Sequence, residues 1–341
     1  MSTRKLCVGT GLLALDIILN GNPKTLPKLS TGGSCGNVLT VLSYLGWESY
    51  PIARLKKNQA ATEIELDLKH WNVKTELITK TDDGSTPVII HRILKDKSGK
   101  PKHRFEFRDP ESGKWLPAYK PVLSKDVPSI LEKKTINATC FYFDRINRAS
   151  IEFAKSYKEK GALVFFEPSS VGASISLFNE CLAISDIIKF SNERIKNYRE
   201  LFPKQQVALE IETCGKDGLN FRLDTGKKNS KWEKVPAYSL DSVSDSAGAG
   251  DWCSAGIISS LISHGKGKLT QETVRHALSY GQALGSINCY FDGARGAMYA
   301  LDADTLLKLA DKTVKTKRTA LPEEPISNKH EGKKVKLSQL F

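Results

Sequence analysis

Hydrophobic and polar positions along this chain predict strands and helices in alternation. Residues 6–10 form a short apolar run with the length of a buried strand, whereas residues 34–45 place apolar side chains at helical spacing, with Val38, Val41 and Leu45 on one face. Further strands are expected at residues 140–144, 162–166, 187–190, 207–212 and 220–223, and further helices at 61–69, 151–160 and 252–261. Because helices that alternate with strands cover both faces of a parallel sheet, this order predicts an α/β fold.

Two segments depart from this order. Residues 88–94 and 104–107 alternate like β-strands and are separated by turn-forming residues, so we expect them to pair outside the main sheet. From Pro322 onward the chain loses its hydrophobic periodicity and becomes polar and basic. The pattern therefore predicts one α/β domain over residues 1–320 and a basic, flexible tail over residues 321–341.

The composition is that of a globular protein with a large core and a basic surface. The chain has 341 residues, 40% of them hydrophobic, and a formal net charge of +13. Its lysines and arginines are spread along the chain without a recognised nucleic-acid motif. We therefore interpret the charge as a solvated surface that attracts ATP and anionic substrates, and we do not expect a nucleic-acid partner.

Cysteine usage and the N-terminal segment bear on localisation. The seven cysteines are odd in number and include no Cys-x-x-Cys pair, which excludes a simple disulfide framework and a zinc site. The apolar stretch after Arg4 and Lys5 is interrupted by Asp16, and no run approaches the length of a membrane span. These features predict a reduced, cytoplasmic protein without a membrane partner.

The most informative segment reads Asp245-Ser-Ala-Gly-Ala-Gly-Asp251 and precedes an apolar helical run. Small residues at Gly248, Ala249 and Gly250 let the backbone approach a ligand, and the free amides at a helix start bind phosphate. The carboxylate of Asp251 would repel that phosphate unless it takes a proton from the attacking hydroxyl. The alternative interpretation is a glycine-rich turn with an aspartate at the helix N-terminus.

These residues carry a resemblance to a known family. Residues 245–257 resemble the C-terminal signature of the ribokinase-like, or phosphofructokinase B (PfkB), carbohydrate kinases. Thr31-Gly-Gly-Ser-Cys-Gly-Asn37 is similar to the family's Gly-Gly-x-x-x-Asn loop, and Thr213-Cys-Gly-Lys-Asp-Gly218 resembles its nucleotide strand and turn. Residues 281–298 resemble its late helix and Gly-Ala segment. The resemblance runs from about residue 5 to residue 300.

The resemblance implies a fold and an activity. The fold would be the three-layer ribokinase-like α/β fold, with a mostly parallel central sheet and a small β lid contributed by about residues 12–20 and 85–110. The activity would be ATP-dependent transfer of the γ-phosphate to a hydroxyl of a sugar or sugar derivative, with Asp251 as catalytic base. We expect a monomer or a homodimer.

The resemblance also implies the binding residues. The acceptor would contact the positions that match the family's sugar-binding residues, which are Asp16, Gly32, Gly33 and Asn37. The nucleotide would contact Lys189, Ser191, Thr213, Gly215, Gly218 and Gln282. Carboxylate and amide groups suit sugar hydroxyls, and glycines allow close approach of the backbone. Taken singly, Asp16 and Asn37 could instead be capping residues, and the nucleotide set ordinary turn, strand or helix residues.

Metal binding is where the sequence departs from the family. The family's Asn-x-x-Glu, whose Glu organises the Mg²⁺ water shell, reads here Ser191-Asn-Glu-Arg194, so Glu193 is the candidate after a shift of one residue. The family's Asp-Pro-Asn reads Glu167-Pro-Ser. Asp245 resembles a residue beside a monovalent cation in the family. We therefore expect ATP and Mg²⁺ as cofactors, with K⁺ as a further candidate.

Three other functions stay open. A nucleoside kinase would share the fold, and a non-catalytic ligand-binding or regulatory relative would explain the altered metal motif. The third is a nicotinamide oxidoreductase, because residues 9–14 imitate a dinucleotide-binding fingerprint. No acidic residue lies about 20 positions further on, however, where that fingerprint requires one.

Overall fold

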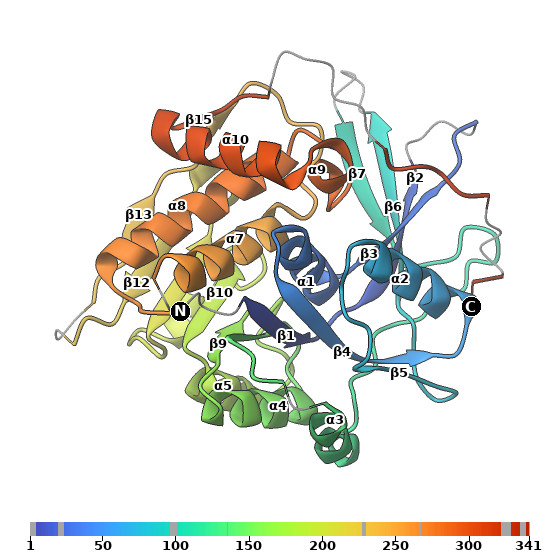
Figure 1. Cartoon of the computed structure of the whole chain (residues 1–341), viewed down its shortest axis with the longest axis horizontal. Coiled ribbons are helices and arrows are strands. Elements are labelled where there is room, and N and C mark those ends of the chain that lie inside the picture. The colour runs from blue at the N-terminus through green and yellow to red at the C-terminus, as the bar shows by residue number, and fades with distance from the viewer. Residues whose placement is uncertain are drawn as a thin grey trace.

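A computed structural model describes residues 5–19, 24–95, 101–134, 136–226, 230–265, 267–321, 329–334 and 339–340. Most of them form one α/β body with a nine-stranded sheet between layers of helices, and a four-stranded sheet extends from it (Figure 1). Residues 97–100 of the turn expected at 97–101, and residues 322–328, 335–338 and 341 of the expected tail, lie outside the described residues.

The nine-stranded sheet has the order β13-β12-β11-β10-β9-β8-β1-β4-β5. Its strands are β1 (Leu6–Thr10), β4 (Glu48–Lys56), β5 (Ile78–Thr81), β8 (Cys140–Phe143), β9 (Leu163–Phe166), β10 (Ile187–Ser191), β11 (Leu209–Thr213), β12 (Leu219–Leu223) and β13 (Glu233–Val235). The strands from β5 to β11 are parallel neighbours, and β12 and β13 add antiparallel pairs at one edge. The predicted α/β fold with a mostly parallel sheet is therefore confirmed.

Helices cover both faces of this sheet because its strands are apolar on both. Cys140 and Tyr142 of β8 pack into one core, whereas Phe141 and Phe143 pack into the other, as the alternation of side chains along a strand requires. The first core lies under α1 (Ser34–Tyr44), α7 (Ala249–Ser263), α8 (Gln271–Asn288) and α10 (Ala303–Thr316). The second lies under α3 (Val127–Lys133), α4 (Arg148–Glu159), α5 (Ile175–Ile184) and α6 (Tyr198–Leu201). Figure 1 shows these two helical layers on opposite sides of the sheet.

The smaller sheet, called the lid sheet below, has the order β3-β2-β6-β7. Its strands are β2 (Ala14–Leu19), β3 (Lys28–Gly32), β6 (Val88–Lys95) and β7 (Pro101–Glu106). Strand β3 was not expected from the sequence, because its Lys-Leu-Ser-Thr-Gly run has no apolar alternation. Helix α2 (Gln59–His70) packs against this sheet with Ile64 and Leu68. Since β2 begins at Ala14, within the residues that imitate a dinucleotide fingerprint, a strand stands where that fingerprint requires a helix.

The remaining elements are short. They are the strands β14 (Ser239–Leu240) and β15 (Arg318–Thr319), the helix α9 (Gly296–Ala300), and the 3₁₀ turns η1 (Ser124–Asp126) and η2 (Gly215–Asp217). Among the described helices, none is long and apolar enough to span a membrane. All seven cysteines are free thiols.

The described part of the C-terminal tail contacts the body of the protein, and the flexibility expected from the tail's sequence stays a prediction. Leu340 is 1% exposed and belongs to the core between α2 and the lid sheet. Its carbonyl accepts a hydrogen bond of 3.1 Å from the amide of Ala60 at the start of α2. The apolar side chain of Leu340 has a partner here that the polar composition of the tail did not indicate.

Candidate functional site

The two glycine-rich motifs meet at the carboxyl ends of the parallel strands. Asn37 lies in the first turns of α1 and Asp251 in the first turn of α7, 214 positions further along the chain. The amide Nδ2 of Asn37 donates a hydrogen bond of 2.7 Å to Oδ2 of Asp251. The crevice outside the carboxyl ends of an open α/β sheet is where such folds bind ligands. The predicted acceptor motif and the predicted base are therefore parts of one site.

The loop before Asp251 is held in a conformation that only glycine accepts readily. Gly248 precedes α7 with a φ of 72°, and a β-carbon there would lie 2.1 Å from the carbonyl oxygen of Ala294. The amide of Ala249 donates to the carbonyl of Ser246 at 3.3 Å. The next amides, of Gly250 and Asp251, belong to the first turn of α7, where amides have no partner within the helix. This geometry suits an anion at the helix N-terminus.

Asp245 anchors the other end of the same loop. Its carboxylate is fully buried and accepts hydrogen bonds from the amides of Ala247 at 2.7 Å and Gly293 at 2.8 Å. Nε2 of His91, on lid strand β6, lies 3.6 Å from this carboxylate. These contacts explain a buried aspartate as a support of the loop, and its role beside a monovalent cation stays a prediction.

The environment of Asp251 raises its pKa to about 7. Burial of the carboxylate is the main cause, and the negative charge of Glu167 adds to it, while the hydrogen bond from Asn37 and the charge of Lys189 act in the opposite direction. A carboxylate with a pKa near neutrality has the proton affinity that a general base needs.

A buried polar cluster lies beside Asp251. Lys189 of β10 is 1% exposed, and its Nζ pairs with Oε1 of Glu167, which directly follows β9. Oε2 of Glu167 accepts from the hydroxyls of Ser254 and Tyr142. Burial alone would lower the pKa of Lys189, but the adjacent carboxylate of Glu167 raises it above its usual value. Lys189 is therefore a fixed positive charge, and its Nζ lies 3.8 Å from where a β-carbon of Gly250 would be.

The predicted acceptor residues gather between the lid sheet and α1. Asp16 lies on β2, Gly32 ends β3 and Gly33 caps α1 with a φ of 80°. A β-carbon at Gly32 would lie 2.0 Å from Cγ of Asp16, so the carboxylate occupies the space that glycine leaves open. Burial raises the pKa of Asp16 to about 7, with the charge of Arg295 opposing it and that of Asp67 adding to it. The Oδ1 atoms of Asp16 and Asn37 are buried acceptors without a hydrogen-bond donor in the described structure.

Four of the predicted nucleotide residues lie on β10 and β11 or in the turn after β11, whereas Gly218 and Gln282 contact the chain around the end of β13. Ser191 and Thr213 are paired at the carboxyl ends of β10 and β11, and Lys189 lies two residues before the end of β10. Gly215 is exposed in the following turn with a φ of 54°. Gly218 is buried, and a β-carbon there would lie 2.2 Å from the carbonyl of Val235, which gives this glycine a packing role. Gln282 of α8 donates to the carbonyl of Pro236 at 3.2 Å, so it lies over the chain that follows β13.

Metal ligands are sparse. In the part of the chain that the structure describes, no group of three or more His, Cys, Asp or Glu side chains is arranged to hold a metal ion. Glu193 is exposed in the turn after β10, where its amide donates to the hydroxyl of Ser191 at 3.2 Å. A divalent ion at this site would need oxygen ligands from a substrate.

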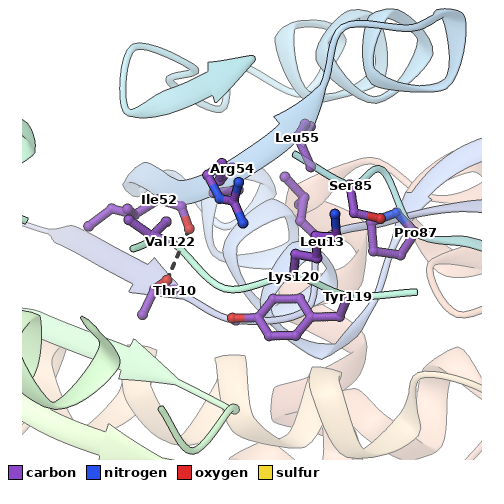
Figure 2. A pocket seen from close by; sticks show the side chains of 12 residues that line it. Thr10, Leu13, Ile52, Arg54, Leu55, Ser85, Pro87, Tyr119, Lys120 and Val122 are labelled. Carbon is purple, nitrogen blue, oxygen red and sulfur yellow. Dashed lines mark hydrogen bonds between the residues drawn. The ribbon is translucent and has the colours of Figure 1, made fainter. Parts of the chain in front are cut away.

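A small cavity lies next to the site and does not form part of it. It is enclosed by Thr10, by residues 52–55 of β4 and by the segment around Tyr119 (Figure 2). Among the residues that line it, the hydroxyl of Thr10 donates to the carbonyl of Ile52 at 3.0 Å. Its volume of about 10 Å³ suits a single water and excludes a sugar.

Several residues of the site were not found from the sequence. Glu167 was noted only as a departure from a motif, although its position directly after an apolar strand was a usable signal. Asp144 directly follows β8. Its carboxylate accepts hydrogen bonds from the amides of Leu12, after β1, and Cys35, in the first turn of α1, and so connects these two segments. The buried Arg295 and its partner Asp67 gave no signal, because isolated charges on helices and loops are usually solvated.

We expect Gly248→Ala to destabilise the protein more than Gly226→Ala does. Both glycines have a φ near 73°, at 72° and 73°, but only at Gly248 would a β-carbon meet another backbone, whereas around Gly226 nothing lies within 4 Å. The left-handed conformation costs each alanine about 1–2 kcal/mol, and the overlap should add about 1–3 kcal/mol at Gly248. Urea denaturation of both variants measures their free energies of unfolding. Equal losses of unfolding free energy in the two variants would contradict the proposed contact of Gly248 with Ala294.

Comparisons with known proteins agree with this geometry. The model of the pfkB family carbohydrate kinases matches residues 20–299. Comparison with curated proteins gives no match.

Solved kinases share the fold. A fructokinase with bound ATP from Xylella fastidiosa is similar with a TM-score of 0.70 at 17% identity, covering 91% of this chain and 99% of that one. An uncharacterized sugar kinase from Pyrococcus horikoshii in complex with ATP has a TM-score of 0.64 at 22% identity, covering 90% and 99%. A nucleoside kinase from Methanocaldococcus jannaschii has a TM-score of 0.63 at 17% identity, covering 92% and 100%.

The family model spans most of the chain, and the fold and the converging motifs agree with it. The chain therefore belongs to the pfkB family of carbohydrate kinases, which are phosphotransferases acting on hydroxyl groups.

Proposed function

We propose that this protein transfers the γ-phosphoryl group of ATP to a hydroxyl of a sugar or sugar derivative, with Asp251 as general base. The observation that carries the proposal is the 2.7 Å hydrogen bond from Asn37 to Asp251. It brings a group suited to a sugar hydroxyl into contact with the group suited to removing its proton. A hydroxyl bound near Asn37 would thus lie within reach of the base.

The acceptor is proposed to lie between the lid sheet and α1. The carboxylate of Asp16 can accept hydrogen bonds from sugar hydroxyls, and Asn37 can both donate and accept. The backbone at Gly32 and Gly33 can approach the sugar because neither residue has a side chain. The buried acceptor atoms Oδ1 of Asp16 and Asn37, which have no described donor, support a ligand that carries several hydroxyl groups.

The transfer step requires positive potential where the phosphoryl group moves. We propose that the amides of Gly250 and Asp251, with the end of the α7 dipole, hold the γ-phosphate. Ala249 was expected to contribute as well, and its amide would have to leave the carbonyl of Ser246 to do so. The fixed charge of Lys189 would stabilise the transferred group from the side of the sheet.

Atoms and charges balance in this step. The acceptor oxygen bonds to the γ-phosphorus while the bond from that phosphorus to the bridging oxygen of ADP breaks. The hydroxyl proton passes to the carboxylate of Asp251, and ADP leaves with the electron pair of the broken bond. Asp251 must therefore be ionised before the step and is protonated after it.

ATP is proposed to bind over the ends of β10 and β11, near Ser191, Thr213 and Gly215, with Gly218 shaping the turn and Gln282 beside the base or ribose. We expect ATP to arrive with Mg²⁺ on its phosphates, since Mg²⁺ is usually held by substrate phosphates, waters and one or two carboxylates. Glu193 is the residue that we propose to contact the water shell of this ion.

We expect Asp251→Asn to lower acceptor-dependent ATP consumption by about 100-fold to 10,000-fold while nucleotide affinity changes little, because asparagine keeps the shape and loses the base. The measurement is ADP release with Mg²⁺ and K⁺ across ketoses, aldoses, sugar acids, sugar phosphates and nucleosides. Asp304→Asn is the matched control, since Asp304 is an exposed acidic residue in the first turn of α10.

The panel also separates the alternatives. Turnover with nucleosides alone would identify a nucleoside kinase of the same fold. Thermal stabilisation by an acceptor without turnover would indicate a binding or regulatory protein and would contradict the proposed kinase activity.

The pH dependence tests the assignment of the base. Because burial raises the pKa of Asp251 to about 7, kcat/KM for the acceptor should fall about tenfold per pH unit below that value and level off above it. Glu167→Gln removes a negative charge that raises this pKa. The substitution should therefore shift the acidic limb of the pH profile, which is the fall of kcat/KM at low pH, to lower pH. Glu159→Gln, an exposed substitution on α4, is the control, and the titrations of ATP and of Asp16, whose pKa is also about 7, are common to all three proteins. A limb that Glu167→Gln leaves in place would argue against Asp251 as the titrating group.

A further inference from the structure

The C-terminal residues 329–334 lie along the outer edge of strand β3. This strand is the edge of the lid sheet, and an edge strand presents backbone groups that need partners. The amide of Lys333 donates to the carbonyl of Pro27 at 2.8 Å, and Nε2 of His330 lies 3.2 Å from the carbonyl oxygen of Leu29. Figure 1 shows part of the dark red C-terminal trace beside the lid strands. The segment therefore covers the beginning of this edge, and Asp67 of α2 accepts from the amide of Thr31 further along it.

The fit of this segment is close. Gly332 packs so tightly that a β-carbon on it would lie 2.6 Å from the carbonyl oxygen of Leu26. Nζ of Lys333 pairs with Glu63 of α2 at 2.7 Å. Burial lowers the pKa of His330 to about 4, so its ring is neutral at pH 7 and can donate from Nε2 to Leu29.

His330 begins a chain of contacts that runs into the core. Its ring stacks on Tyr299 with centroids 3.9 Å apart and an interplanar angle of 5°. The hydroxyl of Tyr299 donates to Oδ1 of Asp67 at 3.1 Å, and Nη2 of Arg295 donates to Oδ2 of the same carboxylate at 2.6 Å. Burial alone would raise the pKa of Asp67, but Arg295 and the hydrogen bonds it accepts keep it below its usual value. Asp67 is thus an ionised link between the tail and Arg295.

This chain of contacts ends at the strand opposite Asp16. Oδ2 of Asp67 also accepts a hydrogen bond from the amide of Thr31 at 2.7 Å, and Nε2 of His330 contacts the carbonyl oxygen of Leu29. Leu29 and Thr31 flank Ser30, which is the residue of β3 that pairs with Asp16. Arg295 is 2% exposed, and its charge acts on Asp16. The tail thereby fixes both the strand and the charge that surround the proposed acceptor carboxylate.

We propose that the segment 329–334 positions the acceptor site through His330, Gly332 and Lys333, which hold β3 and the Arg295–Asp67 pair so that Asp16 is oriented for the acceptor. The inference rests on the proposed function for its effect on substrate. The role belongs to positioning because none of these six residues lies at the reacting atoms. It predicts that the tail affects acceptor binding and leaves the nucleotide half of the site unchanged.

The kinetic test compares His330→Ala with Glu331→Ala in the full-length protein. His330→Ala removes the stacked ring and the bond to Leu29, so KM for the acceptor should rise about 3-fold to 30-fold, with KM for ATP and kcat within about twofold of the wild type. Glu331 is exposed and adjacent, and its substitution should change neither constant. His330→Phe keeps a ring for Tyr299 and should recover part of the acceptor affinity.

Hydrogen exchange gives a readout that does not depend on catalysis. Amides of residues 28–32 should exchange faster in His330→Ala than in the wild type or Glu331→Ala, and Gly332→Val should have the same effect by pushing the segment off Leu26. If His330→Ala does not fold, Gly332→Val and His330→Phe carry the test.

The outcomes are distinct. Unchanged exchange at β3 together with an unchanged acceptor KM would overturn the inference, as would a parallel rise of KM for both ATP and the acceptor, which would mean general destabilisation. A wild-type protein without turnover on any acceptor would overturn the proposed function, and the exchange measurement would still decide whether the tail holds β3.

Discussion

The contact between Asn37 and Asp251 is the interaction on which the site depends. It joins the first turns of α1 and α7, which pack against each other over the same face of the sheet. Each helix starts at a glycine with positive φ, Gly33 for α1 and Gly248 for α7, and each glycine packs against backbone that a side chain would overlap. The backbone near both helix starts is therefore closely packed, and the acceptor and phosphate subsites can lie side by side.

The charges around this contact compensate one another. Asp251 lies near the buried carboxylate of Asp144 and the partly buried carboxylate of Glu167, and its own burial works against ionisation. Lys189 neutralises Glu167 within the same cluster, and the hydroxyls of Ser254 and Tyr142 satisfy the remaining oxygen of that carboxylate. A buried ion pair with satisfied hydrogen bonds contributes more to geometry than to stability. Here it holds a positive charge beside the helix start where a phosphate would carry negative charge.

Some elements of this protein could be predicted from the sequence and others could not, for physical reasons. Strands β1, β8 and β10 were expected because they are buried on both faces and therefore read as apolar runs. Strand β3 was not expected because it is short and polar, and β4 was not because Pro51 and Arg54 interrupt its apolar run. Asp251 and Gly248 were predicted because their chemistry is local to a loop and a helix start, and Asn37 because its motif resembles that of the family. The pairs Glu167–Lys189 and Asp67–Arg295 join residues far apart in sequence, so no local pattern could indicate them. The same holds for His330, whose partners Leu29 and Tyr299 are known only from the fold.

The most direct measurement of the central claim is a crystal structure with an acceptor identified by turnover and a non-hydrolysable ATP analogue. We expect the acceptor hydroxyl to lie within about 2.6–3.2 Å of a carboxylate oxygen of Asp251, with the terminal phosphate on the amides of Gly250 and Asp251. An acceptor hydroxyl bound away from Asp251, or a terminal phosphate bound away from the start of α7, would contradict it.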